Sequence, residues 1–254
     1  MTKKAALVTG GARRIGRAIS LALHQAGYAV AIQANRSVAD AEALRDGIAR
    51  AGGRAAVVRA DLAEQASVAG LVASAIEAVG PLSLLVNNAA MFEPDAIGTL
   101  DAEQFDRQFA VNLRAPVFLS EAFAAQAQNL SGDRDASVVN ILDQRVFKLT
   151  PQFVSYTLAK SALHSATRML AQALAPMVRV NAVAPGPTMA SARQDADDFA
   201  RQAAAVPLGH GPMPQEVAAA VVYLASARSI TGTTLIVDGG QHLAWQTPDA
   251  ITTE

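Results

Sequence analysis

The sequence predicts an α/β fold, a doubly wound parallel sheet of seven strands with helices on both faces, in one domain over residues 1–254. Short apolar runs alternate with longer amphipathic stretches, and no linker rich in proline, glycine or serine interrupts them. Hydrophobic residues make up 51% of the composition and charged residues 17%, which is enough apolar material for one large core. Strict alternation of strand and helix is typical of parallel sheets, because each crossover packs a helix onto a sheet face.

The seven apolar runs are the expected strands, at residues 5–8, 29–33, 55–59, 82–86, 136–141, 178–182 and 234–237. Between them, apolar residues recur at the spacing of one helix face, as Ile15, Ile19 and Leu23 do. The expected helices lie at 15–26, 38–51, 63–79, 101–128, 155–174 and 214–225, with a bend in the fourth near Pro116. The polar stretch 193–198 is expected to be a mobile surface segment.

Charge and composition argue against several classes of function. The net charge of −1 and the pI of about 6.4 lack the basic excess of a nucleic-acid binder. The chain has no cysteine, so a disulfide framework is excluded, and its four histidines lack the spacing of a metal site. No apolar run is long enough for a membrane span. We therefore expect a cytoplasmic protein that acts on a small molecule, without membrane or nucleic acid.

A glycine-rich loop follows the first expected strand and reads Thr9-Gly10-Gly11-Ala12-Arg13-Arg14-Ile15-Gly16. Glycines at a strand-to-helix turn let the backbone approach a pyrophosphate, and the helix N-terminus supplies amide donors and a favourable dipole. Glycine spacing alone is weak, and an ordinary strand-to-helix turn is the alternative.

The residues after the second strand indicate which dinucleotide would bind. A site that selects NAD usually places an acidic residue there, for the ribose diol. Here the strand is followed by Asn35, Arg36 and Ser37. Together with Arg13 and Arg14 of the loop, these groups suit the additional phosphate of NADP. The alternative is that the arginines only cover the surface.

Tyr156 and Lys160 are four residues apart on an expected helix, so they share one face. An ammonium near a phenol favours the phenolate, so we expect Lys160 to lower the pKa of Tyr156. Tyr156 could then exchange a proton with a substrate. Such a pair is common by chance and gains meaning only from the other motifs.

Taken together, the motifs resemble those of the short-chain dehydrogenase/reductase family over about residues 5–240. Their order and spacing match in the loop 9–16, the Asn87-Asn88-Ala89-Ala90 run, Asn112, the Tyr156 and Lys160 pair, and Pro185-Gly186. The resemblance implies a Rossmann-type domain that binds NADP through Gly10, Arg13, Arg14, Ile15, Gly16, Asn35, Arg36, Ser37, Asp61, Leu62, Asn88, Ala89, Ala90, Tyr156, Lys160, Pro185, Gly186 and Thr188.

The resemblance also implies individual roles. Asp61 would contact the adenine, Thr188 the nicotinamide carboxamide, and Lys160 the nicotinamide ribose. Asn112 would shape a helix and hold a proton-relay water, as part of the catalytic set with Tyr156 and Lys160. A homotetramer is implied as well, with interfaces at the helices 101–128 and 155–174 and at residues 234–240.

The chain departs from the family pattern at Asp143, which stands 13 residues before Tyr156, where the family usually carries a catalytic serine. A serine hydroxyl can donate a hydrogen bond to a carbonyl oxygen that gains negative charge, whereas an ionised carboxylate repels that oxygen. Asp143 can accept from N–H groups instead. This argues against simple ketone chemistry and favours a nitrogen heterocycle as substrate.

Pteridine reductases and dihydromonapterin reductases, a branch of the family, resemble the chain at this position. The likeness implies that Phe92 and the nicotinamide sandwich a pterin, and that Arg14 bridges cofactor phosphates and substrate. Ala90 departs from this branch, replacing a serine that some members use near the ligand, and the segment 189–207 matches no pattern of the branch. Phe92 could alternatively be a core aromatic, and Asp143 a surface acid or the mark of an inactive homologue.

The sequence-based hypothesis is an NADPH-dependent reductase that transfers hydride to a C=N bond of a dihydropterin- or dihydrofolate-like ring. Phe92, Arg14 and Asp143 would bind the substrate, and Tyr156 would supply the proton. One alternative is an oxidoreductase of ketones, sugars, steroids or acyl substrates that tolerates the aspartate. The other is a catalytically silent NADP-binding sensor.

Overall fold

Seven parallel strands form one sheet in the computed structural model, which describes residues 4–128, 135–191 and 193–245. The strands are β1 (Ala5–Val8), β2 (Ala29–Ala34), β3 (Ala55–Arg59), β4 (Leu84–Asn87), β5 (Ala136–Ile141), β6 (Val178–Pro185) and β7 (Thr234–Val237). Their order across the sheet is β3-β2-β1-β4-β5-β6-β7, and every neighbouring pair is parallel. The predicted α/β class, strand number and parallel sheet are confirmed.

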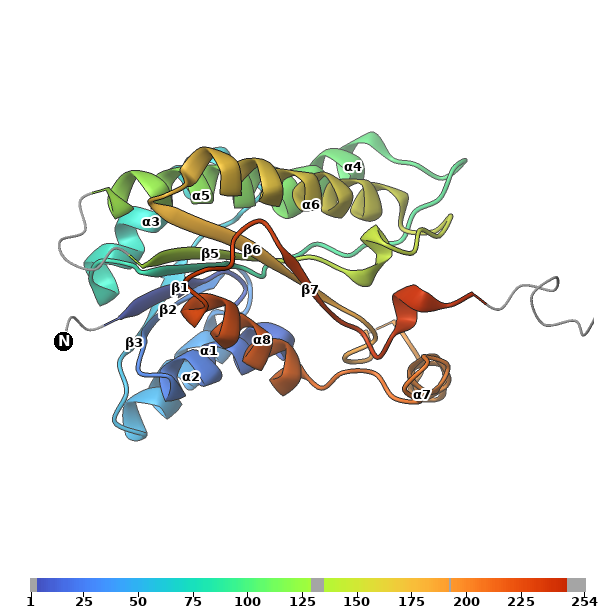
Figure 1. Cartoon of the computed structure of the whole chain (residues 1–254), viewed down its shortest axis with the longest axis horizontal. Coiled ribbons are helices and arrows are strands. Elements are labelled where there is room, and N and C mark those ends of the chain that lie inside the picture. Colours follow the sequence, from blue (N-terminus) through green and yellow to red (C-terminus); the bar gives the residue numbers. More distant parts are fainter. Residues whose placement is uncertain (1–3, 129–134, 192, 246–254) are drawn as a thin grey trace, which may run out of the picture.

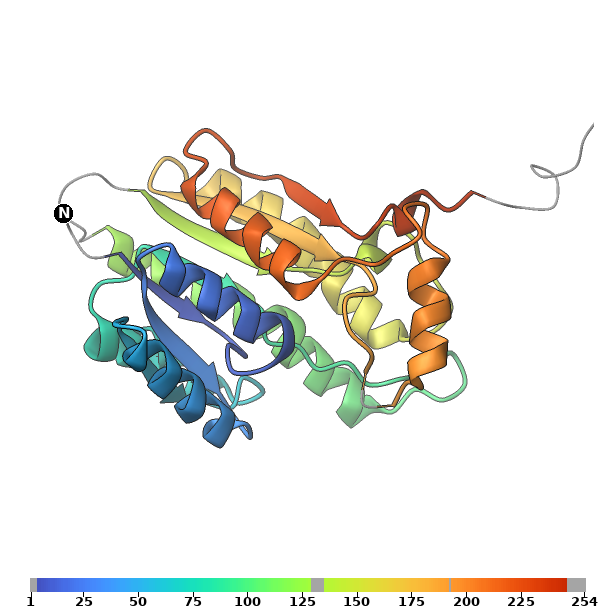
Figure 2. The same ribbon diagram turned by 90° about the horizontal axis from the view of Figure 1, so that it is seen from below.

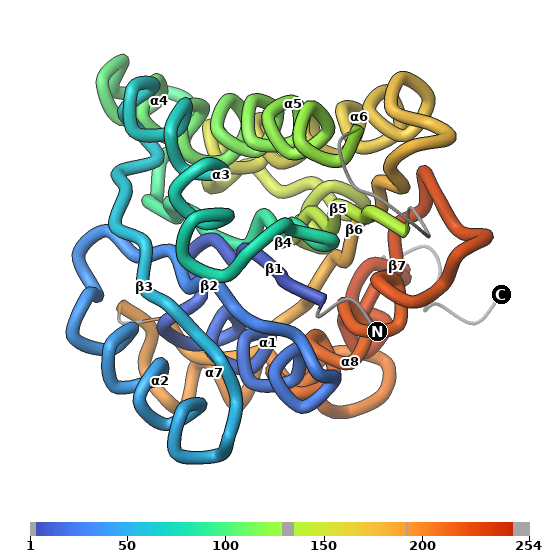
Figure 3. Tube along the Cα trace, turned by 90° about the vertical axis from the view of Figure 1, so that its left-hand side faces the viewer, coloured from blue at the N-terminus to red at the C-terminus, as the bar shows by residue number. Residues whose placement is uncertain are grey.

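Helices cover both faces of this sheet (Figures 1 and 3). On one face lie α3 (Gln65–Val79), α4 (Ala102–Phe109), α5 (Ala115–Ala127) and α6 (Val154–Leu174). On the other lie α1 (Arg14–Gln25), α2 (Val38–Arg50) and α8 (Pro214–Ser226). The two faces have separate apolar cores, one centred on Leu71, Leu119 and Phe123 and the other on Ile19, Leu23 and Val221. The central strands β1 and β4 are buried along their whole length, as strands covered on both sides must be.

The expected helix at 101–128 consists of two α-helices separated by an irregular turn. A π-helical turn, Ala110–Arg114, separates α4 from α5, and Pro116 follows it in the first turn of α5. Within this turn, the side-chain amide of Asn112 exchanges hydrogen bonds with the main chain of Met91, at 2.9 and 3.2 Å. The α-helical geometry is therefore interrupted a few residues before the proline, where a buried side chain ties the helix to the loop after β4.

Other boundaries differ modestly from the expected ones. Strand β4 begins at Leu84 rather than at residue 82, although Leu82 is already fully buried. Strand β6 extends to Pro185, because Val183 and Ala184 continue the buried run. The stretch 193–198, expected to be a mobile surface segment, leads instead into the helix α7 (Ala196–Ala204), which Asp195 caps through a hydrogen bond from the amide of Asp197.

The sheet order places a crevice at the carboxyl ends of the strands. The chain runs outward from β1 to β3 on one side and from β4 to β7 on the other, so the connections diverge between β1 and β4. Ligands of doubly wound sheets bind outside the carboxyl ends at such a switch point. Helix α7 lies beyond this same edge, apart from the two helical layers (Figure 2). In the described residues, no helix combines the length and hydropathy needed to cross a membrane.

Candidate active site

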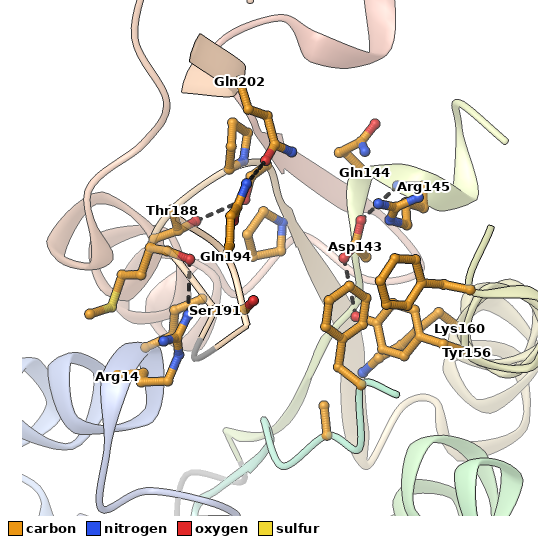
Figure 4. Close-up of a pocket in the computed structure, with 18 of the residues that line it drawn as sticks. Arg14, Asp143, Gln144, Arg145, Tyr156, Lys160, Thr188, Ser191, Gln194 and Gln202 are labelled. Carbon is orange, nitrogen blue, oxygen red and sulfur yellow. Dashed lines mark hydrogen bonds between the residues drawn. The ribbon is translucent and has the colours of Figure 1, made fainter. Parts of the chain in front are cut away.

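A cavity of about 710 Å³ opens at the carboxyl ends of the strands (Figure 4). Its walls come from the loops after β1, β4, β5 and β6, from the start of α6, and from α7. The predicted site residues that line it are Arg14, Ile15, Asn88, Ala90, Phe92, Asp143, Tyr156, Lys160, Pro185, Gly186 and Thr188. Residues distant by more than 100 positions in sequence therefore meet here, as the predicted motifs required.

The glycine loop packs too tightly for side chains at two of its predicted positions. Gly10 has a φ of +59°, which an L-residue adopts only with strain. At Gly16, a Cβ atom would overlap the carbonyl oxygen of Gly10 and the side-chain amide of Asn88. Helix α1 can therefore start directly against the loop, and its first-turn amides face the cavity end of the sheet.

Gln33, which sequence reasoning missed, fixes this loop from β2. Its Oε1 accepts from the amide of Gly10 at 2.8 Å, while its amide nitrogen donates to the carbonyl of Ala60 at 2.8 Å. The side chain is 2% exposed, so it links β1, β2 and the loop after β3 inside the protein. A glutamine in a buried strand was the available signal, because buried amides need specific partners.

The three predicted phosphate-binding arginines lie in different surroundings. Arg36 is exposed at the end of β2, with no acidic residue immediately following the strand. Arg13 is exposed and lies 3.7 Å from Asp40 of α2, an ion pair that solvent weakens. Arg14 has a φ of +50° and crosses toward the segment after β6, where it donates to the carbonyls of Met189 and Ala190 at 3.0 and 2.7 Å.

The remaining predicted cofactor residues surround the first part of the sheet edge. Asn88 holds the loop through hydrogen bonds to Thr9 and Gly10, and Ala89 packs against Gly10. Asp61 caps its own turn by accepting from the amide of Ala63 at 2.9 Å. Leu62 is buried in the core, Asn35 and Ser37 are half-buried beside Arg36, and Thr188 donates to the carbonyl of Gly186 at 3.0 Å.

Tyr156 and Asp143 form the chemical centre of the cavity. The Tyr156 hydroxyl donates to Oδ2 of Asp143 at 3.1 Å, and Oδ1 of Asp143 accepts from the amide of Arg145 at 2.8 Å. Burial raises the pKa of Asp143, although the hydrogen bond and charge of Arg145, the Tyr156 hydroxyl and the Lys160 charge all oppose this. The carboxyl group thus stands where the family pattern has a serine, in direct contact with the tyrosine.

The pKa of Tyr156 moves in the direction opposite to the one expected from its spacing to Lys160. Burial raises it well above its ordinary value, and the charge and hydrogen bond of Asp143 raise it further. The expectation of a lowered pKa is wrong here, because a sequence pattern could show neither the burial of the hydroxyl nor the carboxylate to which it is hydrogen-bonded. Tyr156 is consequently a neutral phenol, which suits a proton donor.

Lys160 lies one helical turn beyond Tyr156 and is almost fully buried. Its Nζ donates to the carbonyl of Ile141 at 2.7 Å and lies 5.8 Å from the centre of the Tyr156 ring. Burial lowers the pKa of Lys160 to about 8, against the opposing influence of Asp143. The Ile141 carbonyl thus fixes the Lys160 ammonium at the cavity wall, and the ammonium retains further N–H donors for a ligand.

Three planar side chains form a stack in one wall. The rings of Phe92 and Phe153 are parallel within 2° at 4.2 Å, and the Arg145 guanidinium lies 5.0 Å from the centre of the Phe153 ring. Tyr156 meets Phe92 edge-on at 4.7 Å. Phe92 lines the cavity together with Phe153, an aromatic residue that sequence reasoning missed.

The start of helix α6, which carries Tyr156 and Lys160, is held by a buried acid that sequence reasoning also missed. Asp95 accepts from the amide of Ser155 at 3.2 and 3.3 Å and from its hydroxyl, and its carbonyl accepts from the amide of Phe153 at 2.8 Å. Gln108 of α4 donates to the Ser155 hydroxyl at 2.7 Å. Asn112 ties α4–α5 to Met91, so it positions the loop that carries Phe92 and is not itself among the cavity-lining residues.

The segment after β6 closes over the cavity and bonds to its opposite wall. Arg193 pairs with Glu93 at 2.8 Å and donates to the carbonyl of Phe92. Gln194 and Gln202 bond to each other at 2.8 Å on the cavity side of α7 (Figure 4). Among the described residues, no cluster of three or more His, Cys, Asp or Glu side chains could hold a metal ion.

Comparison with known proteins decides the family. A family model described as enoyl-(acyl carrier protein) reductase matches residues 10–242. The chain belongs to the short-chain dehydrogenase/reductase family. Among its relatives in this family is pteridine reductase 1 of Leishmania tarentolae, with 33% identity over 95% of this chain and 97% of the relative.

Solved structures of short-chain dehydrogenase/reductases agree with this assignment. The FolM alternative dihydrofolate reductase 1 of Brucella suis, in complex with NADP, is 53% identical, with a TM-score of 0.92 over 97% of this chain and 98% of that one. The corresponding Brucella canis structure with NADP is also 53% identical, with a TM-score of 0.92 over 97% and 96%. The chain is thus an oxidoreductase of this family, as the motifs predicted.

Proposed function

We propose that the protein is an NADPH-dependent reductase that transfers hydride to a C=N bond of a dihydropterin-like ring. The observation that carries the proposal is the contact of Asp143 with Tyr156 at 3.1 Å, in a cavity that Phe92 also lines. Its similarity to two Brucella alternative dihydrofolate reductases with NADP and to a pteridine reductase supports the same reaction class.

The described residues fit NADP(H). The glycine loop at the N-terminus of α1 suits a pyrophosphate, because the close packing that Gly10 and Gly16 allow keeps the loop backbone and the first-turn amides of α1 together at the cavity end of the sheet. The exposed Arg36 and Arg13 suit the additional phosphate of NADP, with Asn35 and Ser37 beside them. Asp61 and Leu62 would adjoin the adenine, Asn88, Ala89 and Ala90 its ribose, and Pro185, Gly186 and Thr188 the nicotinamide.

When bound, the nicotinamide supplies a hydride, and the chain's own residues manage the proton. Tyr156 is neutral because burial and Asp143 raise its pKa, so its hydroxyl carries the proton that a ring nitrogen needs after hydride addition. Lys160, fixed by the carbonyl of Ile141, would hold the nicotinamide ribose below it. Asn112 acts indirectly, by holding the Met91 main chain near Phe92.

Asp143 accounts for the choice of a nitrogen heterocycle. Each carboxylate oxygen already accepts one hydrogen bond and retains a free lone pair for a substrate N–H group. An N–H donor bound to a free lone pair of Asp143 would place the substrate ring next to the hydroxyl of Tyr156, the proposed proton donor. Phe92, backed by Phe153, offers a flat face against which a bicyclic ring can stack. Arg14 reaches the same cavity from the cofactor side.

The test is NADPH oxidation by the purified enzyme with a dihydropterin, dihydrofolate and a panel of ketones. We expect turnover of the pterins that falls about 100-fold or more in Tyr156→Phe, because the proton donor is removed. Asp143→Ala should lose the pterin activity by raising KM and lowering kcat. Turnover of ketones alone, improved in Asp143→Ser, would instead establish a carbonyl reductase, and tight NADPH binding without any turnover would establish a sensor.

We also propose that the enzyme works in the cytoplasm as a homotetramer. An apolar hollow of about 430 Å³ lies between α5 and α6, lined by Val117, Ala124, Ala125, Leu170 and Leu174 among others. Phe118 and Met169 are exposed on the same two helices, at 44% and 66%. Large exposed apolar groups on neighbouring helices favour contact with a second copy of the chain.

A further inference from the structure

The side chain of Gln144 lies in the cavity wall beside Asp143, at the carboxyl end of β5 (Figure 4). It is 6% exposed, and its carbonyl oxygen Oε1 has no hydrogen-bond partner among the described residues. Buried carbonyl oxygens are normally paired, because an unpaired one loses its bonds to water without compensation. An unpaired acceptor in the wall of a binding cavity therefore indicates a donor on the ligand.

Gln144 differs from the other buried side chains with an unpaired oxygen. In the described part of the chain these are Asn87, Gln108, Ser137 and Thr157. None of the four lines the cavity, so a small-molecule ligand there would not reach them. Gln144 alone in this set combines burial, a missing partner and a place in the cavity wall.

The main chain holds Gln144 in a fixed place. The residue opens the short helical turn η2 (Gln144–Val146), and Asp143 caps that turn by accepting from the amide of Arg145. The Gln144 carbonyl accepts from the amides of Phe147 at 2.9 Å and Lys148 at 3.1 Å. A side chain with a fixed backbone and little free space loses little entropy on binding, which makes it suited to discriminate between ligands.

We propose that Gln144 is a substrate-binding residue that accepts a hydrogen bond from an exocyclic amino group, and so selects amino-substituted rings over their oxo counterparts. The inference rests on the proposed function, because it assigns a contact in the same cavity. Asp143 and Gln144 both line the cavity, so their oxygens offer two acceptors for separate N–H donors of an aminopyrimidinone ring. An oxo group there would bring lone pairs toward Oε1, and buried polar mismatches are strongly rejected.

The experiment compares pterin with lumazine, which has an oxo group in place of the 2-amino group. Binding of each to the NADP⁺-loaded enzyme is measured by titration for the wild type and for Gln144→Met, which keeps side-chain length without the amide. We expect pterin to bind about tenfold more weakly to the variant, and lumazine to bind more tightly than it does to the wild type, because the oxygen that opposes its oxo group is gone. Gln241→Met, at another glutamine of the same wall, is the matched control and should not alter the ratio of the two affinities.

A second variant keeps the test decisive if Gln144→Met folds poorly. Gln144→Glu retains an acceptor and adds a negative charge that repels an oxo group, so it should keep pterin binding within about threefold and weaken lumazine about tenfold or more. Equal changes for both ligands, or no change, would overturn the role of Gln144. Failure of the wild type to reduce any dihydropterin would overturn the proposed function instead, whatever the effect of the variants. The NADPH dissociation constant should be the same in all variants, which would show that their cofactor site is intact.

Discussion

At the scale of single residues, the site is governed by burial as much as by charge. The Tyr156 hydroxyl is buried and bonded to a carboxylate, which raises its pKa, so the tyrosine keeps its proton. The Lys160 ammonium is bonded to a strand carbonyl, and burial lowers its pKa to about 8. This favours reduction, in which the tyrosine must give a proton, over oxidation, in which it would have to accept one.

The lowered pKa of Lys160 gives a prediction for stability. The unfolded chain has a lysine pKa of 10.5, whereas the folded one has a pKa of about 8, so between these values the unfolded state binds more protons. Stability therefore rises with pH in that window, as the buried charge is lost. From pH 7.5 to 9.5, the free energy of unfolding of the cofactor-free wild type should rise by about 2 kcal/mol relative to Lys160→Met. Urea unfolding of both proteins checks this, and parallel pH curves would contradict it.

Arg36 gives a prediction for cofactor choice. Because it is exposed at the end of β2, its removal should not affect folding, and the contact that we propose with the additional phosphate of NADP would be worth about 1.5–3 kcal/mol. Arg36→Ala should raise the Kd for NADPH about tenfold or more and leave that for NADH nearly unchanged, as measured by nucleotide fluorescence. Arg50→Ala, also exposed and on α2, is the control. An equal increase in the Kd values for NADPH and NADH would show that Arg36 does not bind the additional phosphate of NADP.

Some of these residues were predictable and others were not. Tyr156, Lys160 and Asp143 follow from fixed spacings on one helix and the strand before it. Gln33 offered only the sign of a glutamine within a buried strand, and Asp95 and Gln144 offered none, because the bonds of Gln33 and Asp95 cross 23 and 60 residues of sequence and the burial of Gln144 depends on the folded loops. A polar residue gains its role from partners that only the fold brings together.

At the scale of elements, two aspartates cap helices in comparable ways but in different surroundings. Asp95 is buried and holds the start of α6, and Asp101 is exposed and accepts from the amide of Gln104 in α4 at 2.8 Å. Asp95→Ala should lower the free energy of unfolding by about 1–3 kcal/mol and lower kcat, because Phe153 and Tyr156 lose their support. Asp101→Ala should cost about 1 kcal/mol and leave kcat unchanged. Chemical unfolding and steady-state kinetics check both, and equal effects of the two on kcat would contradict the assignment.

The segment after β6 is joined to the Phe92 loop by Arg193, an exposed bond of modest strength. Arg193→Ala should raise the pterin KM about two- to fivefold with little change in kcat, since the closed arrangement becomes less populated. Arg201→Ala, which removes an ion pair with Asp198 on the same segment, is the control and should leave KM unchanged. A fall in kcat without a change in KM would show that Arg193 does not act through closure.

Strands were more predictable than the helices at the rim of the site. Every expected strand exists, since buried parallel strands are continuous apolar runs. Helix α7 was missed because none of its residues is fully buried, so its sequence contains no apolar pattern that would predict a helix. Its signal was Asp195 at the cap with Asp197 and Asp198 in the first turn, a pattern that marks a helix start even at the surface.

At the scale of the whole molecule, one helical layer has an unused apolar surface. The exposed side chains of α5 and α6 sit over a core that the same helices bury against the sheet, so the layer is apolar on both sides. A helix layer with two apolar sides is normally covered by another copy of the chain in a symmetric oligomer. Tyr156 and Lys160 of the cavity lie in the first turns of α6, whereas Leu170 and Leu174 of the hollow lie in its last turns, so assembly would stabilise the site without forming it.

Ala125 offers a test of that assembly, because it is exposed in the hollow between α5 and α6 and its replacement need not disturb the core. Ala125→Arg would place a charge in an apolar contact, whose burial without a partner is costly. We expect the wild type to be a tetramer by light scattering after size-exclusion chromatography, and the variant to be a dimer or monomer with unchanged NADPH affinity. Ala43→Arg, at an exposed position of α2 on the other face, should remain a tetramer. If both variants keep the mass of the wild type, the α5–α6 face is not an interface, and its apolar side chains need another explanation.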